Sequence, residues 1–281
     1  MGELEHEGRK LLKIIMAIKV FTISSEAESV RRLGLPTFIG EIPEYLDHYK
    51  DDICLRFGNS RSVFDRKDCK KEFKNVINTS KAIRANCEKF ESRKKLLAAG
   101  VSCPKVYMGN LPAGKFVVRP LEHSAGSQFS VREGPCEINS GEYGSEFLKS
   151  KTEVRVWICG KAALMAKRVP LKGVDDKRGL CRSQWGYSFV YKQVPQDIYN
   201  SCQLALKTIN LKFGAFDIIL YAGKHFILEG NSSPTIDLVR LERFYKENLL
   251  KLMKEEFKEN FDKLAERKKL EKEGYKFFNL D

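Results

Sequence analysis

Two acidic residues and an amide stand in a strongly apolar part of the sequence. Asp217 and Glu229 lie within the segment 216–231, and Asn231 follows Glu229 by two positions. A buried carboxylate without a partner costs several kcal/mol, so such a residue usually binds a cation or forms an ion pair. Two carboxylates and an amide oxygen are a donor set that suits Mg2+. The spacing alone leaves two interpretations open, a Mg2+ site and a pair of ordinary salt bridges.

A hairpin is the element that must position these three residues. The runs 216–221 and 225–228 are apolar and β-branched, and Ala222-Gly223 between them predicts a tight turn. Across such a hairpin Asp217 and Glu229 fall near the same end. Side chains alternate along a strand, so Asn231 lies on the same face as Glu229. The pattern therefore predicts that the three side chains lie together.

A second chemical feature is a basic strand end that runs into a small-residue loop. Arg119 closes the apolar run 116–119. The loop that follows holds four candidate phosphate contacts, His123, Ser124, Gly126 and Ser127. Small residues let backbone N–H groups approach phosphate oxygens, and the arginine adds positive charge. A Walker loop and the G-x-G-x-x-G fingerprint are absent. From these residues alone, the loop is either a phosphate cradle or an ordinary turn.

Several further elements are predicted from the sequence pattern. A β-branched run at 16–23, a helical segment at 26–33 and a short apolar run at 53–57 indicate a small α/β unit. Residues 70–99 have helical composition and end at the Gly100 stop. Paired strands are predicted at 153–159 and 162–166.

The C-terminal part predicts one long charged helix over 237–276. Its apolar stripe consists of Leu241, Tyr245, Leu249, Met253, Phe257, Phe261 and Leu264. We expect this stripe to pack on its own domain rather than to bind a partner helix.

The composition describes a globular protein with a basic excess. The 281 residues include 50 basic and 37 acidic side chains, a net charge of +13, with 42% hydrophobic residues. No apolar run approaches the roughly 20 residues that cross a bilayer, so we expect no membrane partner. The eight cysteines form no C-x-x-C pair, which argues against zinc or iron–sulfur ligation and for small core residues. No secretory signal is apparent, so we expect a reduced, cytoplasmic protein.

Taken in order and spacing, these features resemble the ATP-grasp superfamily over roughly residues 52–238. Leu228-Glu-Gly-Asn231 with Pro234 resembles the signature Leu-Glu-x-Asn…Pro, and Asp217 stands upstream of it. Glu153-Val-Arg-Val156 resembles the family's acid-x-Arg-Val strand, and a basic pair, Lys167-Arg168, follows its hairpin. The segments 56–60 and 182–187 are similar to segments of phage-encoded members.

The resemblance implies an α/β (α+β) ATP-grasp fold. It has a small N-terminal Rossmann-like α/β domain, two subdomains that sandwich a nucleotide, and a long C-terminal helix. The expected boundaries are an extension at 1–15, the N-terminal domain at 16–85, the central subdomain at 86–145, the C-terminal subdomain at 146–240 and a helical extension at 241–281.

The resemblance also implies ATP and Mg2+ as cofactors and assigns residues to them. The metal ligands would be Asp217, Glu229 and Asn231. Lys89 and Arg119 would contact phosphate, and Glu153 would accept ribose hydroxyls. The phosphate lid would contain His123, Ser124, Gly126 and Ser127. The hinge that reads the adenine edge would consist of Glu146, Phe147 and Leu148.

One position departs from the D-alanine ligase type. That type has an arginine two residues before the metal aspartate, whereas this chain has Ala215. The charge that stabilises the transferring phosphoryl group must then come from elsewhere. The candidate catalytic residues are Arg155, Lys167 and Arg182.

The resemblance implies an ATP-dependent carboxylate–amine ligase that works through an acyl phosphate and releases ADP and phosphate. Its partners would be a small-molecule or peptide carboxylate and an amine, with anionic substrates compatible with the basic excess. A small-molecule kinase on the same fold stays an alternative. A basic nucleic-acid-binding protein is the least favoured alternative, because acids interleave with bases along 240–276 and zinc-finger and helix-turn-helix signatures are not evident.

Overall fold

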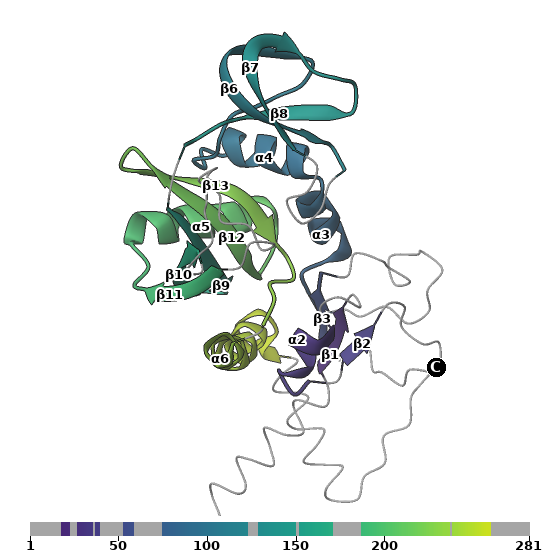
Figure 1. Ribbon diagram of the computed structural model, residues 1–281. Helices are drawn as coiled ribbons and strands as arrows, with labels where there is room; N and C mark the ends of the chain where they lie inside the picture. Colours follow the sequence, from purple (N-terminus) through teal and green to yellow (C-terminus); the bar gives the residue numbers. More distant parts are fainter. Residues whose placement is uncertain are drawn as a thin grey trace, which may run out of the picture. The chain divides into compact units, whose positions relative to one another are not determined.

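The computed structural model describes residues 18–22, 27–35, 37–39, 53–58, 75–122, 129–149, 152–170, 187–236 and 238–259. The chain divides into two compact units, one formed by Met1–Ile83 with Ser232–Asp281 and the other by Arg84–Asn231. Figure 1 labels the elements of both units. The domain boundaries expected from the sequence stay predictions.

The first unit contains a parallel sheet of order β2-β1-β3-β4. Its strands are β1 (Ile18–Thr22), β2 (Thr37–Ile39), β3 (Ile53–Phe57) and β4 (Asn75–Ile77). Helix α2 (Ala27–Arg31) contacts β1 and β2, as a crossover between parallel strands requires. Helix α6 (Val239–Glu256) belongs to the same unit, and the ring of its Tyr245 meets that of Phe57 edge-on at 6.4 Å. The predicted small α/β unit is confirmed.

The described part of α6 carries the predicted apolar stripe. Leu241, Tyr245, Leu249 and Met253 are buried, while Phe261 and Leu264 lie outside the described residues. Exposed ion pairs one turn apart, such as Arg243–Glu247 at 2.8 Å, occupy the other side. Among the described residues, no helix is both long enough and apolar enough to cross a bilayer.

The prediction of one helical segment over 70–99 is wrong in its first part. Asn75–Ile77 forms β4, which pairs in parallel with β3. Asn78 then adopts a positive φ of 57°, and the Thr79 hydroxyl accepts a hydrogen bond from the Ala82 N–H, which starts α3 (Ser80–Cys87). A second helix, α4 (Lys89–Ala98), follows. The buried strand pairing outweighs the helical composition of this short segment.

The second unit contains two antiparallel sheets. The four-stranded sheet has the order β5-β8-β6-β7 and consists of β5 (Val106–Tyr107), β6 (Asn110–Pro120), β7 (Ser130–Glu137) and β8 (Glu142–Glu146). The five-stranded sheet has the order β11-β10-β9-β12-β13 and consists of β9 (Glu153–Cys159), β10 (Ala162–Pro170), β11 (Tyr187–Lys192), β12 (Phe213–Tyr221) and β13 (Lys224–Asn231). The sequence analysis did not identify β5, β7, β8, β11 or the helix α5 (Gln196–Thr208).

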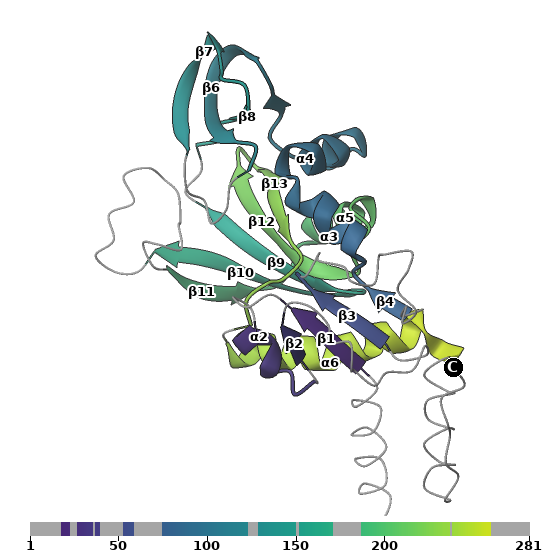
Figure 2. The same ribbon diagram turned by 90° about the vertical axis from the view of Figure 1, so that its right-hand side faces the viewer.

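Helices position the five-stranded sheet. Helix α5 contacts β9 and β12, while α4 contacts β5, β13 and α5. Both views therefore show α4 between the two sheets of this unit (Figures 1 and 2). Because β13 is an edge strand, its outer backbone groups need partners, and α3 and α4 are the elements beside it.

Candidate active site

The predicted hairpin is confirmed and brings the two acidic residues together. Tyr221 pairs with Lys224 around Ala222-Gly223, whose φ angles of 50° and 72° are those of a tight hairpin turn. At the far end of the hairpin Asp217 stands directly opposite Glu229. Asn231 pairs with Ala215 and so shares their face of the sheet.

A β-bulge makes this pairing possible. The register shifts between Asp217 and Ile218, because Ile218 pairs with Ile227 while Asp217 pairs with Glu229. Leu228 is therefore the extra residue of β13. The bulge is a feature that the sequence analysis did not predict.

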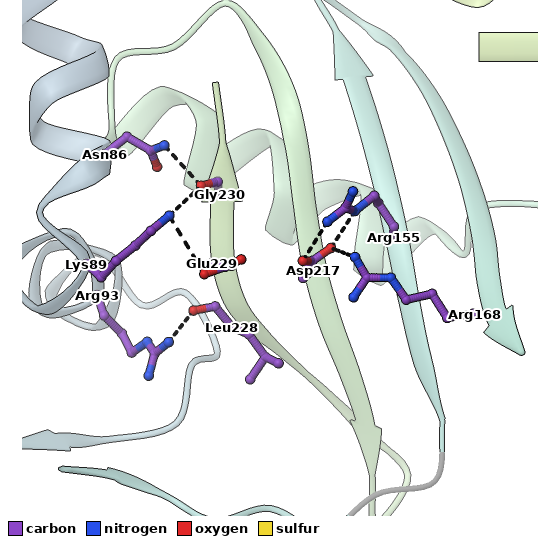
Figure 3. A network of polar contacts seen from close by, with 9 residues as sticks. All are labelled: Asn86, Lys89, Arg93, Arg155, Arg168, Asp217, Leu228, Glu229 and Gly230. Carbon is purple, nitrogen blue, oxygen red and sulfur yellow. Dashed lines mark hydrogen bonds and ion pairs between the residues drawn. The ribbon is translucent and has the colours of Figure 1, made fainter. Parts of the chain in front are cut away.

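Asp217 is surrounded by two arginines. Nε and Nη2 of Arg155 donate to its two carboxylate oxygens at 2.6 and 2.8 Å, and Nη2 of Arg168 donates to Oδ1 at 2.9 Å. Arg168 also donates to Glu153 at 3.4 Å. Figure 3 shows both guanidinium groups directed at the same carboxylate. Within the described residues, two arginines and two acids thus belong to one largely buried charge network.

The charges of the arginines control the ionisation of Asp217. Burial by itself would raise the pKa of this carboxyl, but the charges and hydrogen bonds of Arg155 and Arg168 outweigh burial and hold the pKa well below its ordinary value. Asp217 is consequently a carboxylate at neutral pH, and any cation that binds it competes with two guanidinium groups.

Glu229 has a different environment. Its side chain is 30% exposed, and among the described residues it forms an ion pair with the Lys89 ammonium at 3.8 Å. The same ammonium donates to the Gly230 carbonyl at 3.1 Å. Lys89, a predicted phosphate contact, thus lies beside the predicted metal ligands, as Figure 3 shows.

The register separates the two basic residues of β10. Arg168 pairs with Glu153 and Lys167 with Val154. Because side chains alternate, Lys167 is placed on the face opposite to Asp217, whereas Arg168 lies on the same face. The role of Lys167 as a catalytic candidate stays a prediction. From the sequence, Arg168 was expected only as a member of the basic pair Lys167-Arg168, with Lys167 as the catalytic candidate, whereas the register places Arg168 on the face of Glu153 and Arg155.

The predicted nucleotide contacts of the four-stranded sheet lie at its ends. Arg119 stands near the end of β6, with its guanidinium carbon 5.8 Å from the ring centre of Phe129. The Glu146 N–H donates to the Lys105 carbonyl and the Phe147 N–H to the Lys115 carbonyl, which anchors the predicted hinge. Leu148 follows and is half-buried.

The remaining predicted site residues fall outside the described part of the chain. They are the lid residues His123, Ser124, Gly126 and Ser127, and the catalytic candidate Arg182. Their assignments stay predictions.

The donor set at this end of the hairpin fits an oxygen-loving cation. Two carboxylates stand opposite each other, and Asn231 on the same face carries an amide oxygen. Carboxylate and amide oxygens are ligands of Mg2+. A cation could bind Asp217 only if it displaced hydrogen bonds of Arg155 and Arg168, because these two arginines occupy both of its carboxylate oxygens.

Comparisons with known proteins identify the fold. No protein-family model and no curated protein match the chain. Among solved structures, it is similar to the ATP-grasp ligase PsnB complexed with a minimal precursor (TM-score 0.57, 15% identity, 84% of this chain and 99% of that one). It is also similar to D-alanine–D-alanine ligase from Bacillus anthracis complexed with ATP (0.60, 12%, 88% and 98%).

A third similar structure is a Chryseobacterium gregarium RiPP-associated ATP-grasp ligase in complex with ADP and a leader and core peptide (TM-score 0.59, 13% identity, 85% of this chain and 96% of that one). At these identities the likeness concerns the fold. The ATP-grasp fold expected from the sequence is confirmed.

Proposed function

We propose that this protein is an ATP-dependent carboxylate–amine ligase that forms an amide bond through an acyl phosphate. The observation that carries the proposal is the pair Asp217–Glu229, set opposite each other beside Arg155, Arg168 and Lys89 on an ATP-grasp fold. Similar structures include ligases bound to ATP, to ADP with Mg, and to peptides. ATP and Mg2+ are accordingly the proposed cofactors.

The residues divide the work of phosphoryl transfer between them. Lys89 and Arg119 hold phosphate oxygens, and Glu153 and the hinge at 146–148 orient the nucleoside. Asp217, Glu229 and Asn231 would hold Mg2+, which supplies neutralisation of phosphate charge. Arg155 and Arg168 turn from Asp217 toward the transferring phosphoryl group, where their charge compensates for the absence of an arginine at position 215.

The reaction then proceeds in two displacements. An oxygen of the substrate carboxylate attacks the terminal phosphorus of ATP, the bond to the ADP oxygen breaks, and ADP leaves. The amine nitrogen attacks the carbon of the acyl phosphate, the phosphate leaves with the bonding electrons, and the nitrogen loses a proton. Exclusion of water by the predicted lid at 123–127 would protect the activated acyl group.

A screen for ADP release tests the proposal. The protein is incubated with ATP, Mg2+ and mixtures of amino acids and acidic peptides, and the products are identified by mass spectrometry. We expect ADP, phosphate and a new amide, and hydroxylamine should trap the acyl phosphate as a hydroxamate. Asp217→Asn and Glu229→Gln should abolish ADP release, while Glu133→Gln, 80% exposed on β7, should not.

A phosphorylated product with ADP and no free phosphate would instead establish a kinase and overturn the amide-forming step. The proposal includes a cytoplasmic location, where ATP is available and thiols stay reduced. The similarity of 56–60 and 182–187 to phage-encoded members stays a prediction.

A further inference from the structure

The bulge at Leu228 determines which residue of β13 faces Asp217. Counted from the turn pair Tyr221–Lys224, a regular ladder would place Leu228 opposite Asp217 and Glu229 opposite Phe216. A slip of one residue moves every side chain to the other face of the sheet. Without the bulge, Glu229 would therefore be directed to the face that carries the buried Phe216.

Four hydrogen bonds from the segment 86–102 cover the outer edge of β13 at the bulge. The Ser102 carbonyl accepts from the Ile227 N–H at 2.8 Å, and Arg93 donates through Nη2 to the Leu228 carbonyl. Asn86 and Lys89 both donate to the Gly230 carbonyl, at 3.0 and 3.1 Å. A side chain at Gly230 would come within 2.8 Å of the Asn86 Oδ1, so the close approach requires glycine.

Arg93 is the unusual member of this set. It is only 7% exposed, and burial lowers its pKa. Among the described residues no carboxylate lies within ion-pair distance of Arg93, and its Nε has no hydrogen-bond partner. Burying a guanidinium without a counter-ion is costly, and a lysine or an apolar residue could fill a helix position that had only a packing role. Figure 3 shows its guanidinium directed at the carbonyl of the extra residue.

We propose that Arg93 is a positioning residue that holds the bulge at Leu228 and thereby turns Glu229 toward Asp217. For the part that concerns metal binding, the inference rests on the proposed function. Arg93 acts through the backbone of β13, by its hydrogen bond to the Leu228 carbonyl. Its expected signature is a change in the metal site that depends on Glu229.

Amide hydrogen exchange on the nucleotide-free full-length protein tests the first half of the proposal. The variants are Arg93→Met, Arg93→Lys and the control Lys94→Met, which removes an exposed neighbouring cation. We expect residues 226–231 to exchange at least tenfold faster in Arg93→Met and the control to match the wild type. Arg93→Lys keeps the charge with a shorter reach and should lie between them. If Arg93→Met does not fold, the exchange rates of Arg93→Lys are compared with the wild type instead. Unchanged exchange of residues 226–231 in whichever of these variants folds overturns the proposal.

Binding of Mn2+ in the presence of ADP, measured by electron paramagnetic resonance, tests the second half. We expect Arg93→Met to weaken binding at least tenfold and Lys94→Met to leave it within twofold. Because Arg93 acts through Glu229, the double variant Arg93→Met/Glu229→Gln should bind no more weakly than Glu229→Gln alone. Additive losses, or a lower melting temperature with unchanged Mn2+ affinity, would assign Arg93 a purely structural role. If the wild type binds no Mn2+, the proposed metal site fails, and the exchange data alone then decide whether Arg93 holds the bulge.

Discussion

The two carboxylates that face each other across the hairpin are held in opposite ways. Asp217 is 10% exposed in its side chain and accepts three hydrogen bonds from two arginines, at 2.6 to 2.9 Å. Glu229 is 30% exposed, and in the part of the chain that the structure describes its ion-pair partner, Lys89, stands at 3.8 Å. Two residues that pair across the same two strands therefore differ in how strongly their side chains are held by ion pairs and hydrogen bonds.

The difference follows from their strands. β12 lies inside the sheet, between β9 and β13, so Asp217 obtains its counter-charges from β9 and β10 on the same face. β13 is the edge strand, so Glu229 is supported from outside the sheet, by helix α4. An acid in the interior of a sheet must be paired to fold, whereas an acid at the edge can be left available for a ligand.

The largest expected effect is the loss of stability on removing Asp217. Asp217→Ala removes the carboxylate that accepts three hydrogen bonds from Arg155 and Arg168. Breaking a buried ion pair from one side costs about 3–5 kcal/mol, and we expect a loss of this size in the free energy of unfolding. Urea denaturation followed by the fluorescence of the buried Trp157 measures it, with the other tryptophan, Trp185, replaced by phenylalanine.

The exposed Glu133 of β7 provides the control for this experiment. Glu133→Ala removes a carboxylate whose cation is 3.8 Å away, and we expect a change within about 0.5 kcal/mol. A loss below about 1 kcal/mol for Asp217→Ala would show that the two acids of the hairpin are not held differently.

The next effect is the coupling between Arg155 and Asp217. Arg155→Met and Asp217→Asn should each destabilise the protein, but the double variant should be more stable than the sum of the two losses predicts, by about 2 kcal/mol. The reason is that each single change already removes both hydrogen bonds of the bidentate pair, so the second change cannot remove them again. The same urea experiments give this coupling energy, and additive losses would contradict the geometry.

Part of the contrast between Asp217 and Glu229 could be predicted from the sequence, and the part that could not has a physical reason. The turn at Ala222-Gly223 places Asp217, Glu229 and Asn231 at the same end of the hairpin, and the alternation of side chains places Asn231 on the face of Glu229, but Glu229 shares the face of Asp217 only because of the bulge. Counting from the Gly160-Lys161 turn would also have placed Arg168, and not Lys167, on the face of Arg155 and Glu153. Both placements follow from local geometry.

The bulge at Leu228 could not be counted in this way. Nothing in the residues of β13 marks the extra position, because the contacts that accompany it come from a segment more than a hundred residues earlier, such as Arg93. The strand Asn75–Ile77 was missed for the same kind of reason, since its pairing with β3 is a tertiary contact. Local patterns predict elements, and long-range contacts correct them.

A smaller effect concerns acid stability. The pKa of Asp217 in the folded protein is below its ordinary value of about 3.9, so the unfolded chain binds its proton more readily. Its contribution to stability is therefore complete above about pH 4 and is lost as the pH falls through the folded pKa. Below about pH 4 the wild type should lose its advantage over Asp217→Asn by about 1.4 kcal/mol per pH unit. Urea midpoints of both proteins between pH 5 and pH 3 provide the measurement, and a constant difference would contradict it.

Within the candidate site, the smallest expected change in stability is that of Glu229→Gln. The substitution keeps the shape of a partly exposed side chain and removes one ion pair at 3.8 Å, so the free energy of unfolding should change by less than about 1 kcal/mol. The same variant should nevertheless lose Mn2+ binding by more than the roughly 10–100-fold that removal of an outer contact causes. Urea denaturation and the Mn2+ titration together decide the point. A stability loss as large as that of Asp217→Ala would mean that Glu229 on the edge strand is also needed for folding. Intact Mn2+ binding would instead exclude Glu229 from the metal site and leave Asp217 as a structural acid paired with its arginines.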